Sequence, residues 1–328
     1  MKLFLSYIRL IRPFNLTMIV FTLYMVRFCF ILPVLSFSSF HLQVSEWAFA
    51  LFAIAFGLIA AAGYIINDYY DVEIDRINKP GKEIIGSVVS KSSALTSYWI
   101  LNVVGIIIGF WSCHKAGTPI LGTLFLFYLI GLWLYSYKLK STFLFGNLLI
   151  SVFLGIVPLA SAYIEAQADL KMPEAINSFI ILPIRTGAWA IAGFAFFSTL
   201  IREIVKDMED LEGDMLAGCY TMPIVLGNKK VKVLVLILVF LLIALLGILQ
   251  YNTWSSGWRN SFYYILVFIQ LPCLIVIWKM LKASIPKDFH RISTWLKIIM
   301  LTGICYLFVF AYECYITLQY IRLLSHSL

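Results

Sequence analysis

The chain has 328 residues, of which 62% are hydrophobic and 13% charged, and its mean hydropathy is +0.92. A soluble globular domain is about 45–50% apolar and about 25% charged, so this composition excludes that class and indicates a membrane protein. The formal net charge is +8, but no basic run resembles a nucleic-acid-binding arm. We therefore expect no nucleic-acid partner and attribute the charge to membrane orientation and to attraction for anionic lipids and substrates.

Nine apolar stretches are each long enough to cross a hydrocarbon layer of about 30 Å, which takes about 20 helical residues. Their length and their lack of period-two alternation exclude strands, so the predicted fold is all-α, a single polytopic domain over residues 1–328. The expected helices are Leu16–Leu35, Trp47–Ile66, Ala94–Trp111, Ile120–Tyr137, Phe143–Tyr163, Gly187–Val205, Val233–Gln250, Phe262–Lys282 and Leu296–Ile316.

The segments between these stretches alternate in basic charge. Of the 25 Lys and Arg residues, 19 fall at or near one side, five on the other, and Arg27 is the one that lies away from both ends of a span. Lys and Arg accumulate in the cytoplasmic loops of membrane proteins. The count predicts a multi-pass protein of the cell membrane, plasma or inner, with a cytoplasmic N-terminus and the C-terminus outside.

Acidic residues gather in two segments that the charge count places on the cytoplasmic side, near residues 67–92 and 202–232. These segments hold 11 of the 17 Asp and Glu residues. Both contain the spacing DxxDxxxD, at Asp68, Asp71 and Asp75 and again at Asp207, Asp210 and Asp214. Because positions i, i+3 and i+7 share one helical face, each triplet is expected to point three carboxylates the same way at a helix end.

Three like charges on one stripe repel each other, so bound cations are expected to hold them together. Carboxylate oxygens suit Mg²⁺, which takes one or two carboxylates together with phosphate oxygens of a substrate. The paired motifs could then clamp one diphosphate between two metal ions. The alternatives are solvated loop charges and a calcium-binding loop, but a calcium loop needs ligands at alternate positions and a Gly at position six, which neither motif has.

Basic residues flank the carboxylates and are candidates for stabilising a departing diphosphate, since positive charge there lowers the barrier. They are Arg76, Lys79, Lys138, Lys140, Arg202 and Lys206. For Arg76, Lys138 and Lys140, simple anchoring at a positive-inside surface is an equal alternative. Arg27 lies about 20 Å along its helix from Pro13. It either snorkels or makes an interhelical bond, or it lines a cavity and meets a polar acceptor.

At this point the motifs resemble a known family. The segment Asn67–Pro80, NDYYDVEIDRINKP, is similar to the NDxxDxxxD signature of the UbiA family of intramembrane prenyltransferases. The segment Arg202–Asp214, REIVKDMEDLEGD, resembles the second Asp-rich loop of that family. Its sequence is most similar to the motif of the ether-lipid branch of the family, the digeranylgeranylglyceryl phosphate synthases. Smaller matches include Arg12-Pro13 with Asn15, Tyr135-Ser136 with the lysines after it, and Gly146-Asn147. Lys79-Pro80 departs from the family's frequent Arg-Pro, which keeps the charge but loses bidentate phosphate binding.

The resemblance implies nine transmembrane helices around a central cavity and Mg²⁺-dependent transfer of an isoprenyl group from an isoprenyl diphosphate to an acceptor, with the active site facing the cytoplasm. The implied metal ligands are Asn67, Asp68, Asp71, Asp75, Asp207, Asp210 and Asp214. The implied catalytic residues are Asp71, Asp207 and Lys206. The candidate diphosphate ligands, found from charge and position, are Arg76, Lys79, Lys138, Lys140 and Arg202. The candidate acceptor ligands are Asn15 and, in the cavity alternative, Arg27.

The expected acceptor is geranylgeranylglyceryl phosphate or a related ether-lipid precursor. An aromatic acceptor of quinone biosynthesis, such as 4-hydroxybenzoate, homogentisate or a naphthoate, is the alternative within the family. An ion-coupled membrane transporter is the alternative from another class, because carboxylates within the membrane also serve ions and protons. Transporter sites, however, usually lie near the bilayer midplane, whereas both motifs here are predicted at helix ends.

Overall fold

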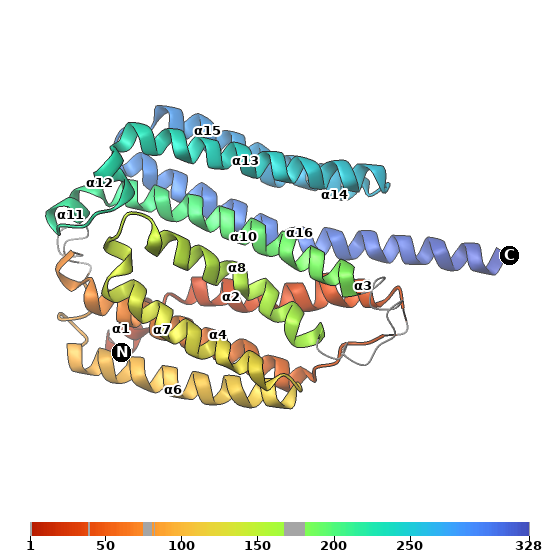
Figure 1. Cartoon of the computed structure of the whole chain (residues 1–328), viewed down its shortest axis with the longest axis horizontal. Helices are drawn as coiled ribbons and strands as arrows, with labels where there is room; N and C mark the ends of the chain where they lie inside the picture. Colours follow the sequence, from red (N-terminus) through yellow and green to blue (C-terminus); the bar gives the residue numbers. More distant parts are fainter. Residues whose placement is uncertain (1, 39, 75–80, 82, 167–180, 328) are drawn as a thin grey trace. The chain divides into compact units, whose positions relative to one another are not determined.

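The computed structural model describes residues 2–38, 40–74, 81, 83–166 and 181–327 (Figure 1). The regular structure within these ranges is helical, and the one β-type contact there is an isolated bridge between Ile85 and Val89. This confirms the predicted all-α class for the described part of the chain.

Nine helical stretches of the described residues are long and apolar enough to span a membrane, as predicted. They are Pro13–Leu35, Glu46–Tyr70, Lys91–Lys115, Pro119–Tyr137, Phe145–Glu165, Leu182–Glu209, Asn228–Ser255, Arg259–Lys282 and Pro286–Ser325. The largest difference from prediction is the last helix, which was expected only over Leu296–Ile316. Hydropathy reports the apolar part of a helix, whereas polar turns continue it beyond the hydrocarbon layer. The chain is therefore a multi-pass membrane protein, and the orientation of its termini stays a prediction.

The helices form two compact units whose segments alternate along the chain. Unit 1 comprises Met1–Phe21, Val44–Phe153 and Asp210–Asn228, and unit 2 comprises Thr22–Gln43, Leu154–Glu209 and Lys229–Leu328. Each is described by itself below. The single domain expected over residues 1–328 stays a prediction.

Unit 1 is built on α4 (Glu46–Tyr70), which packs against α6 (Lys91–Lys115) and α7 (Thr123–Tyr137), as Figure 1 shows. Phe56 of α4 makes edge-on contacts with Phe125 and Tyr128 of α7, with ring centroids 5.1 and 5.4 Å apart. The other elements of unit 1 are α1 (Lys2–Leu10), the start of α2 (Pro13–Met25), η2 (Pro119–Gly122), η3 (Leu139–Ser141), the start of α8 (Phe145–Ala166), α11 (Leu211–Leu216) and α12 (Met222–Leu226).

A small apolar core fixes the end of α4 that carries the first Asp motif. One cluster of buried side chains lies there. It includes Leu10 of α1, Ile66 of α4, Tyr98 of α6, and Val72 and Val89 between α4 and α6. Burial of such side chains stabilises the fold by about 1.5–3 kcal/mol each. The position of the α4 end is therefore set by packing from segments on both sides of the motif.

Unit 2 is built on α16 (Pro286–Ser327), against which α10 (Leu182–Glu209), α14 (Arg259–Ile265) and α15 (Leu271–Lys282) pack. The second Asp motif begins in the last turn of α10. The other elements of unit 2 are the end of α2, η1 (Val26–Ile31), α3 (Leu32–Leu35), most of α8, α13 (Asn228–Ser255) and η6 (Leu266–Gln270). Large apolar side chains such as Ile237 and Ile248 of α13 are exposed, as expected of a surface that faces lipid.

Candidate active site

The first Asp motif lies at the C-terminal end of α4. Asn67 and Asp68 belong to its last turn, and Asp71 caps it, with a backbone N–H that donates to the carbonyl of Asn67 over 3.0 Å. The C-terminal end of a helix carries partial negative charge, so a carboxylate there is disfavoured by about 0.3–1 kcal/mol unless a cation compensates it. Asp75, Arg76 and Lys79 lie outside the described residues.

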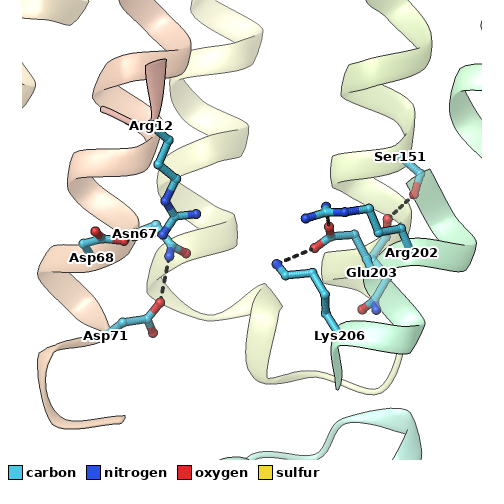
Figure 2. Close-up of polar contacts among 9 residues, drawn as sticks. Arg12, Asn67, Asp68, Asp71, Ser151, Arg202, Glu203 and Lys206 are labelled. Carbon is cyan, nitrogen blue, oxygen red and sulfur yellow. Dashed lines mark hydrogen bonds and ion pairs between the residues drawn. The ribbon is translucent and has the colours of Figure 1, made fainter. Parts of the chain in front are cut away.

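Two cations from distant parts of unit 1 meet these carboxylates. Arg12 donates from Nη2 to Oδ1 of Asp68 over 2.6 Å, and Lys140 of η3 pairs through Nζ with Oδ1 of Asp71. Asn67 donates from Nδ2 to the other oxygen of Asp71 over 2.7 Å, as Figure 2 shows. Lys140 and Asp71 are each 17% exposed, against 38% and 19% for Arg12 and Asp68, so water screens the Lys140–Asp71 pair less.

Arg12 reaches Asp68 from the turn between α1 and α2. A residue before proline is disfavoured in the right-handed helical region, and Arg12 precedes Pro13 and adopts φ 51°. Its guanidinium carbon lies 4.8 Å from the ring centroid of Tyr64, one turn before Asp68 in α4. Sequence reasoning noted Arg12 only as part of a resemblance and did not assign it to the site.

The second Asp motif runs across a helix break. Asp207 lies in the last turn of α10, Asp210 occupies the junction at φ −91° and ψ 7°, and Asp214 lies in α11. The expected single helical stripe of three carboxylates is therefore wrong here. Asp is a favoured residue at a helix N-terminus, and Glu212 and Asp214 in the first turn of α11 complement its positive end, so the chain starts a new helix instead of continuing the old one.

A local charge cluster precedes the second motif on α10. Glu203 accepts from Nη1 of Arg202 over 2.6 Å and from Nζ of Lys206 over 3.4 Å, as Figure 2 shows. Glu203 is buried, with a side chain 10% exposed. Arg202 and Lys206 were both predicted site residues, whereas Glu203 was not. The cluster holds one cation, Lys206, directly beside Asp207 in the sequence and a second, Arg202, one turn earlier.

The η3 turn connects the first motif with the chain that follows the second. Lys140 in this turn pairs with Asp71, and the carbonyl of the next residue, Ser141, accepts from the backbone N–H of Tyr220 over 2.8 Å. A Cβ atom at Gly146 would lie 2.8 Å from the carbonyl oxygen of Leu139 and 2.9 Å from Cα of Lys140. The turn can therefore pack this closely on the start of α8 only because residue 146 is glycine.

The residues present suit a magnesium ion chemically. Asn67, Asp68 and Asp71 place hard oxygen donors within about one helical turn, and Mg²⁺ prefers such donors together with water and phosphate oxygens. Among the described residues, no group of three or more His, Cys, Asp or Glu side chains converges as a metal cluster. A site here would therefore use few protein carboxylates, as Mg²⁺ sites that also bind a substrate phosphate do.

The two predicted acceptor residues, Asn15 and Arg27, belong to α2 and η1. Arg27 is fully buried in η1, and its Nε lies 3.0 Å from Oε1 of Glu165, near the end of α8. The other carboxylate oxygen of Glu165 accepts from the backbone N–H of Gln43 over 2.9 Å. These contacts match the interhelical alternative for Arg27. Asn15 lies half-buried in the first turn of α2, and Lys138, beside Lys140, is exposed.

Sequence reasoning missed three charged partners, and each had a detectable signal. Glu165 is an acid at the end of an apolar span, and intramembrane charges usually pair with each other, which points to Arg27. Glu203 lies three residues before Lys206, a spacing that brings helical side chains together. Arg12 precedes a helix-starting proline, which marks a turn, but the approach of this turn to Asp68 depends on tertiary packing.

A helical membrane protein with Asp-rich motifs and paired cations at helix ends has the features of a membrane-embedded enzyme for anionic substrates. The model of the UbiA prenyltransferase family matches residues 26–301, so the chain belongs to this family and is a prenyltransferase. It is 31% identical to the digeranylgeranylglyceryl phosphate synthase of Methanobrevibacter smithii over 298 residues, which is 90% of this chain and 94% of that protein. It is 33% identical to the synthase of the same name from Saccharolobus solfataricus over 261 residues, 77% of this chain and 81% of that protein.

Solved structures share the fold. A structure reported for digeranylgeranylglyceryl phosphate synthase in membranes has a TM-score of 0.62 at 24% identity, covering 95% of this chain and 99% of its own. A UbiA homologue from Archaeoglobus fulgidus, bound to DMAPP and Mg²⁺, has a TM-score of 0.57 at 18% identity and covers 94% and 99%. These likenesses extend over nearly the whole chain.

Proposed function

We propose that this prenyltransferase transfers an isoprenyl group from an isoprenyl diphosphate, in a Mg²⁺-dependent reaction, to geranylgeranylglyceryl phosphate or a related ether-lipid precursor. The observation that carries the diphosphate half of the proposal is the meeting of Asp68 and Asp71 with Arg12 and Lys140 at the end of α4. The acceptor is inferred from relatives that are at least 31% identical and are named digeranylgeranylglyceryl phosphate synthases. Membership of a prenyltransferase family favours this enzyme over the ion-coupled transporter.

In the proposed reaction, the bond between C1 of the isoprenyl group and the diphosphate oxygen breaks, and diphosphate leaves with the electron pair. A hydroxyl oxygen of the acceptor forms the new bond to C1, and its proton passes to water. When bound, Mg²⁺ supplies Lewis-acid neutralisation of the diphosphate charge. Lys140, Arg202 and Lys206 add fixed positive charge where negative charge builds up on the leaving group.

The predicted metal ligands keep their assignment within this proposal. Asn67, Asp68 and Asp71 would hold Mg²⁺ on the first motif, and Asp207, Asp210 and Asp214 on the second. Asp75, Arg76 and Lys79 are proposed from the sequence alone. The charge count agrees with a site that opens to the cytoplasm and accepts the water-soluble phosphate group of the acceptor. This orientation remains a prediction.

The acceptor roles of Asn15 and Arg27 stay predictions. Arg27→Leu separates two outcomes, since this side chain is fully buried beside Glu165. Because loss of one partner of a buried pair leaves an uncompensated charge, we expect a loss of about 3–5 kcal/mol in stability. The joint variant Arg27→Leu with Glu165→Leu should recover most of this loss in a thermal unfolding measurement. A raised KM for the acceptor in the joint variant would instead support a contact between Arg27 and the acceptor.

The purified chain, incubated with labelled geranylgeranyl diphosphate and Mg²⁺, tests the proposal. Geranylgeranylglyceryl phosphate, 4-hydroxybenzoate, homogentisate and a naphthoate are offered separately, and the lipid product is identified by mass. We expect product with the glyceryl phosphate, its loss in EDTA and its return with added Mg²⁺. Product with an aromatic acceptor alone would overturn the acceptor assignment, and transfer that persists in EDTA would overturn the metal assignment.

A further inference from the structure

We infer that Arg12 and Lys140 are resident counter-cations of the first Asp motif, which occupy its carboxylates before substrate arrives and exchange with Mg²⁺. This inference rests on the proposed function. It assigns Arg12 to the site and gives Lys140 two successive partners: Asp71 in the metal-free protein, and the diphosphate once metal is bound. The exchange would let the protein bind metal and diphosphate together more readily than metal alone.

The carboxylates of the first Asp motif lie in an electrostatically unfavourable position. Asp68 and Asp71 lie in the last turn and at the C-cap of α4, where the helix dipole opposes negative charge. Two carboxylates at i and i+3 also repel each other. Without a cation, the end of α4 would therefore be electrostatically unfavourable, so positive charge here stabilises the fold even before substrate binds.

The compensating positive charge comes from two distant residues of unit 1. Arg12 comes from the α1–α2 turn and Lys140 from η3, and each meets one carboxylate through a direct ion pair. Both oxygens of Asp71 are engaged, Oδ1 by Lys140 and Oδ2 by Asn67. A metal ion that binds Asp71 therefore competes with the Lys140 ammonium for the same carboxylate charge. The predicted ligands of the metal and the observed partners of the cations are the same carboxylate groups.

A metal ion that takes the place of the two cations would release them from Asp71 and Asp68. The Lys140 ammonium stays beside the site when it leaves Asp71, because η3 is held by Gly146 and by the bond from Tyr220 to Ser141. The Arg12 guanidinium stays beside Asp68 because it lies over the ring of Tyr64, one turn earlier in α4. Both groups bind phosphate oxygens well, Arg through two donors and Lys as a point charge. Diphosphate carries the negative charge that would replace their lost carboxylate partners.

The exchange and a purely structural role predict opposite changes in metal affinity when the two cations are removed. If Arg12 and Lys140 compete with metal, their removal strengthens metal binding when no diphosphate is present. If they only pin the end of α4 in place, their removal disorders the carboxylates and weakens metal binding. If they serve only as diphosphate ligands, their removal leaves binding of metal alone unchanged.

The experiment measures binding of Mn²⁺, as a paramagnetic probe for Mg²⁺, to the full chain in nanodiscs by electron paramagnetic resonance. Without diphosphate, we expect Lys140→Met to raise the affinity for Mn²⁺ by about 3- to 10-fold. Arg12→Gln should raise it by about 2- to 4-fold, because that pair is more exposed to water. With Mn²⁺ saturating, both variants should bind inorganic pyrophosphate about 3- to 10-fold more weakly.

Two control variants accompany these measurements. Lys91→Met removes the same charge from an exposed position at the start of α6 in unit 1 and should change neither affinity. Lys140→Arg keeps the positive charge and should bind Mn²⁺ about as the natural chain does. If Lys140→Met does not fold, as judged by its thermal unfolding, Arg12→Gln and Lys140→Gln carry the test.

An unchanged or weaker affinity for Mn²⁺ in folded Lys140 and Arg12 variants overturns the inference. Failure of the proposed function looks different, because the natural chain would then neither bind Mn²⁺ nor release diphosphate from an isoprenyl diphosphate. Turnover by the natural chain, combined with no gain in metal affinity in the variants, removes the exchange and leaves the proposed function in place.

Discussion

The cations near the two Asp motifs are held in opposite ways. In the first, Asp68 and Asp71 pair with Arg12 and Lys140, which are 56 and 69 positions away in the sequence. In the second, Arg202 and Lys206 are held by Glu203, a neighbour on the same helix. The first motif therefore depends on the packing of α1, α4 and η3, whereas the charge cluster of the second depends on one helix. This difference predicts which distant substitutions disturb each motif.

Loss of a carboxylate proposed to bind Mg²⁺ should have the largest effect and should affect both motifs alike. We expect Asp71→Ala and Asp207→Ala each to lower prenyl transfer by about 10²–10³-fold or more, since each removes charge stabilisation of the leaving group. Product formation with saturating Mg²⁺ measures this, and the amount of protein in the membrane is the control. Turnover at the natural rate by either variant would contradict the assignment of that motif.

Gly146→Ala should disturb the first motif from a distance. The new Cβ would meet the Leu139 carbonyl oxygen and Cα of Lys140 at 2.8 and 2.9 Å, so η3 must shift and Lys140 with it. We expect kcat/KM for the isoprenyl diphosphate to fall by about 10-fold, although alanine favours a helix by about 0.5–1 kcal/mol over glycine. The matched control is Gly193→Ala on α10, where no atom lies within 4 Å of the new Cβ. Equal kinetics in the two variants would remove the positional role of η3.

Glu203→Gln tests the local arrangement at the second motif. The variant leaves Arg202 and Lys206, one turn apart, without their shared carboxylate, so both side chains lose a fixed position. We expect KM for the isoprenyl diphosphate to rise by about 5- to 10-fold with a smaller change in kcat. The KM of Glu203→Asp should lie between those of the natural chain and of Glu203→Gln.

The control is Glu209→Gln, which lies on the same helix as Glu203 and removes a pair with the exposed His290 of α16. The Mg²⁺ concentration for half-maximal activity should stay the same in Glu203→Gln. A shift in that concentration with an unchanged KM would identify Glu203 as a metal ligand instead of a positioning residue.

Lys138→Met should have the smallest effect and sharpen the contrast within the η3 region. Lys138 is exposed, while Lys140 two residues later pairs with Asp71. We expect KM for the isoprenyl diphosphate to rise by less than about 3-fold in Lys138→Met, because exposed charges are screened, and by about 10-fold in Lys140→Met. Steady-state kinetics of the two variants side by side decides between them. Equal effects would show that both lysines contact the diphosphate.

The sequence alone determined the membrane class, the nine spanning helices found among the described residues, within a few residues at most ends, and the motif residues from Asn67 to Asp71 and from Arg202 to Asp214. These features are local: hydropathy over about 20 residues and fixed spacings along a helix carry them. The family resemblance supplied the reaction class, which the family match over residues 26–301 confirmed.

Only the tertiary structure decided which charges meet. It ended α10 at Glu209 and restarted the chain as α11, where spacing alone had predicted one stripe of carboxylates. It also brought Arg12 to Asp68, chose Lys140 over Lys138 for Asp71, and joined Arg27 to Glu165. Such pairs form because packing of apolar helix faces brings distant segments together, and no spacing within either segment encodes the partner.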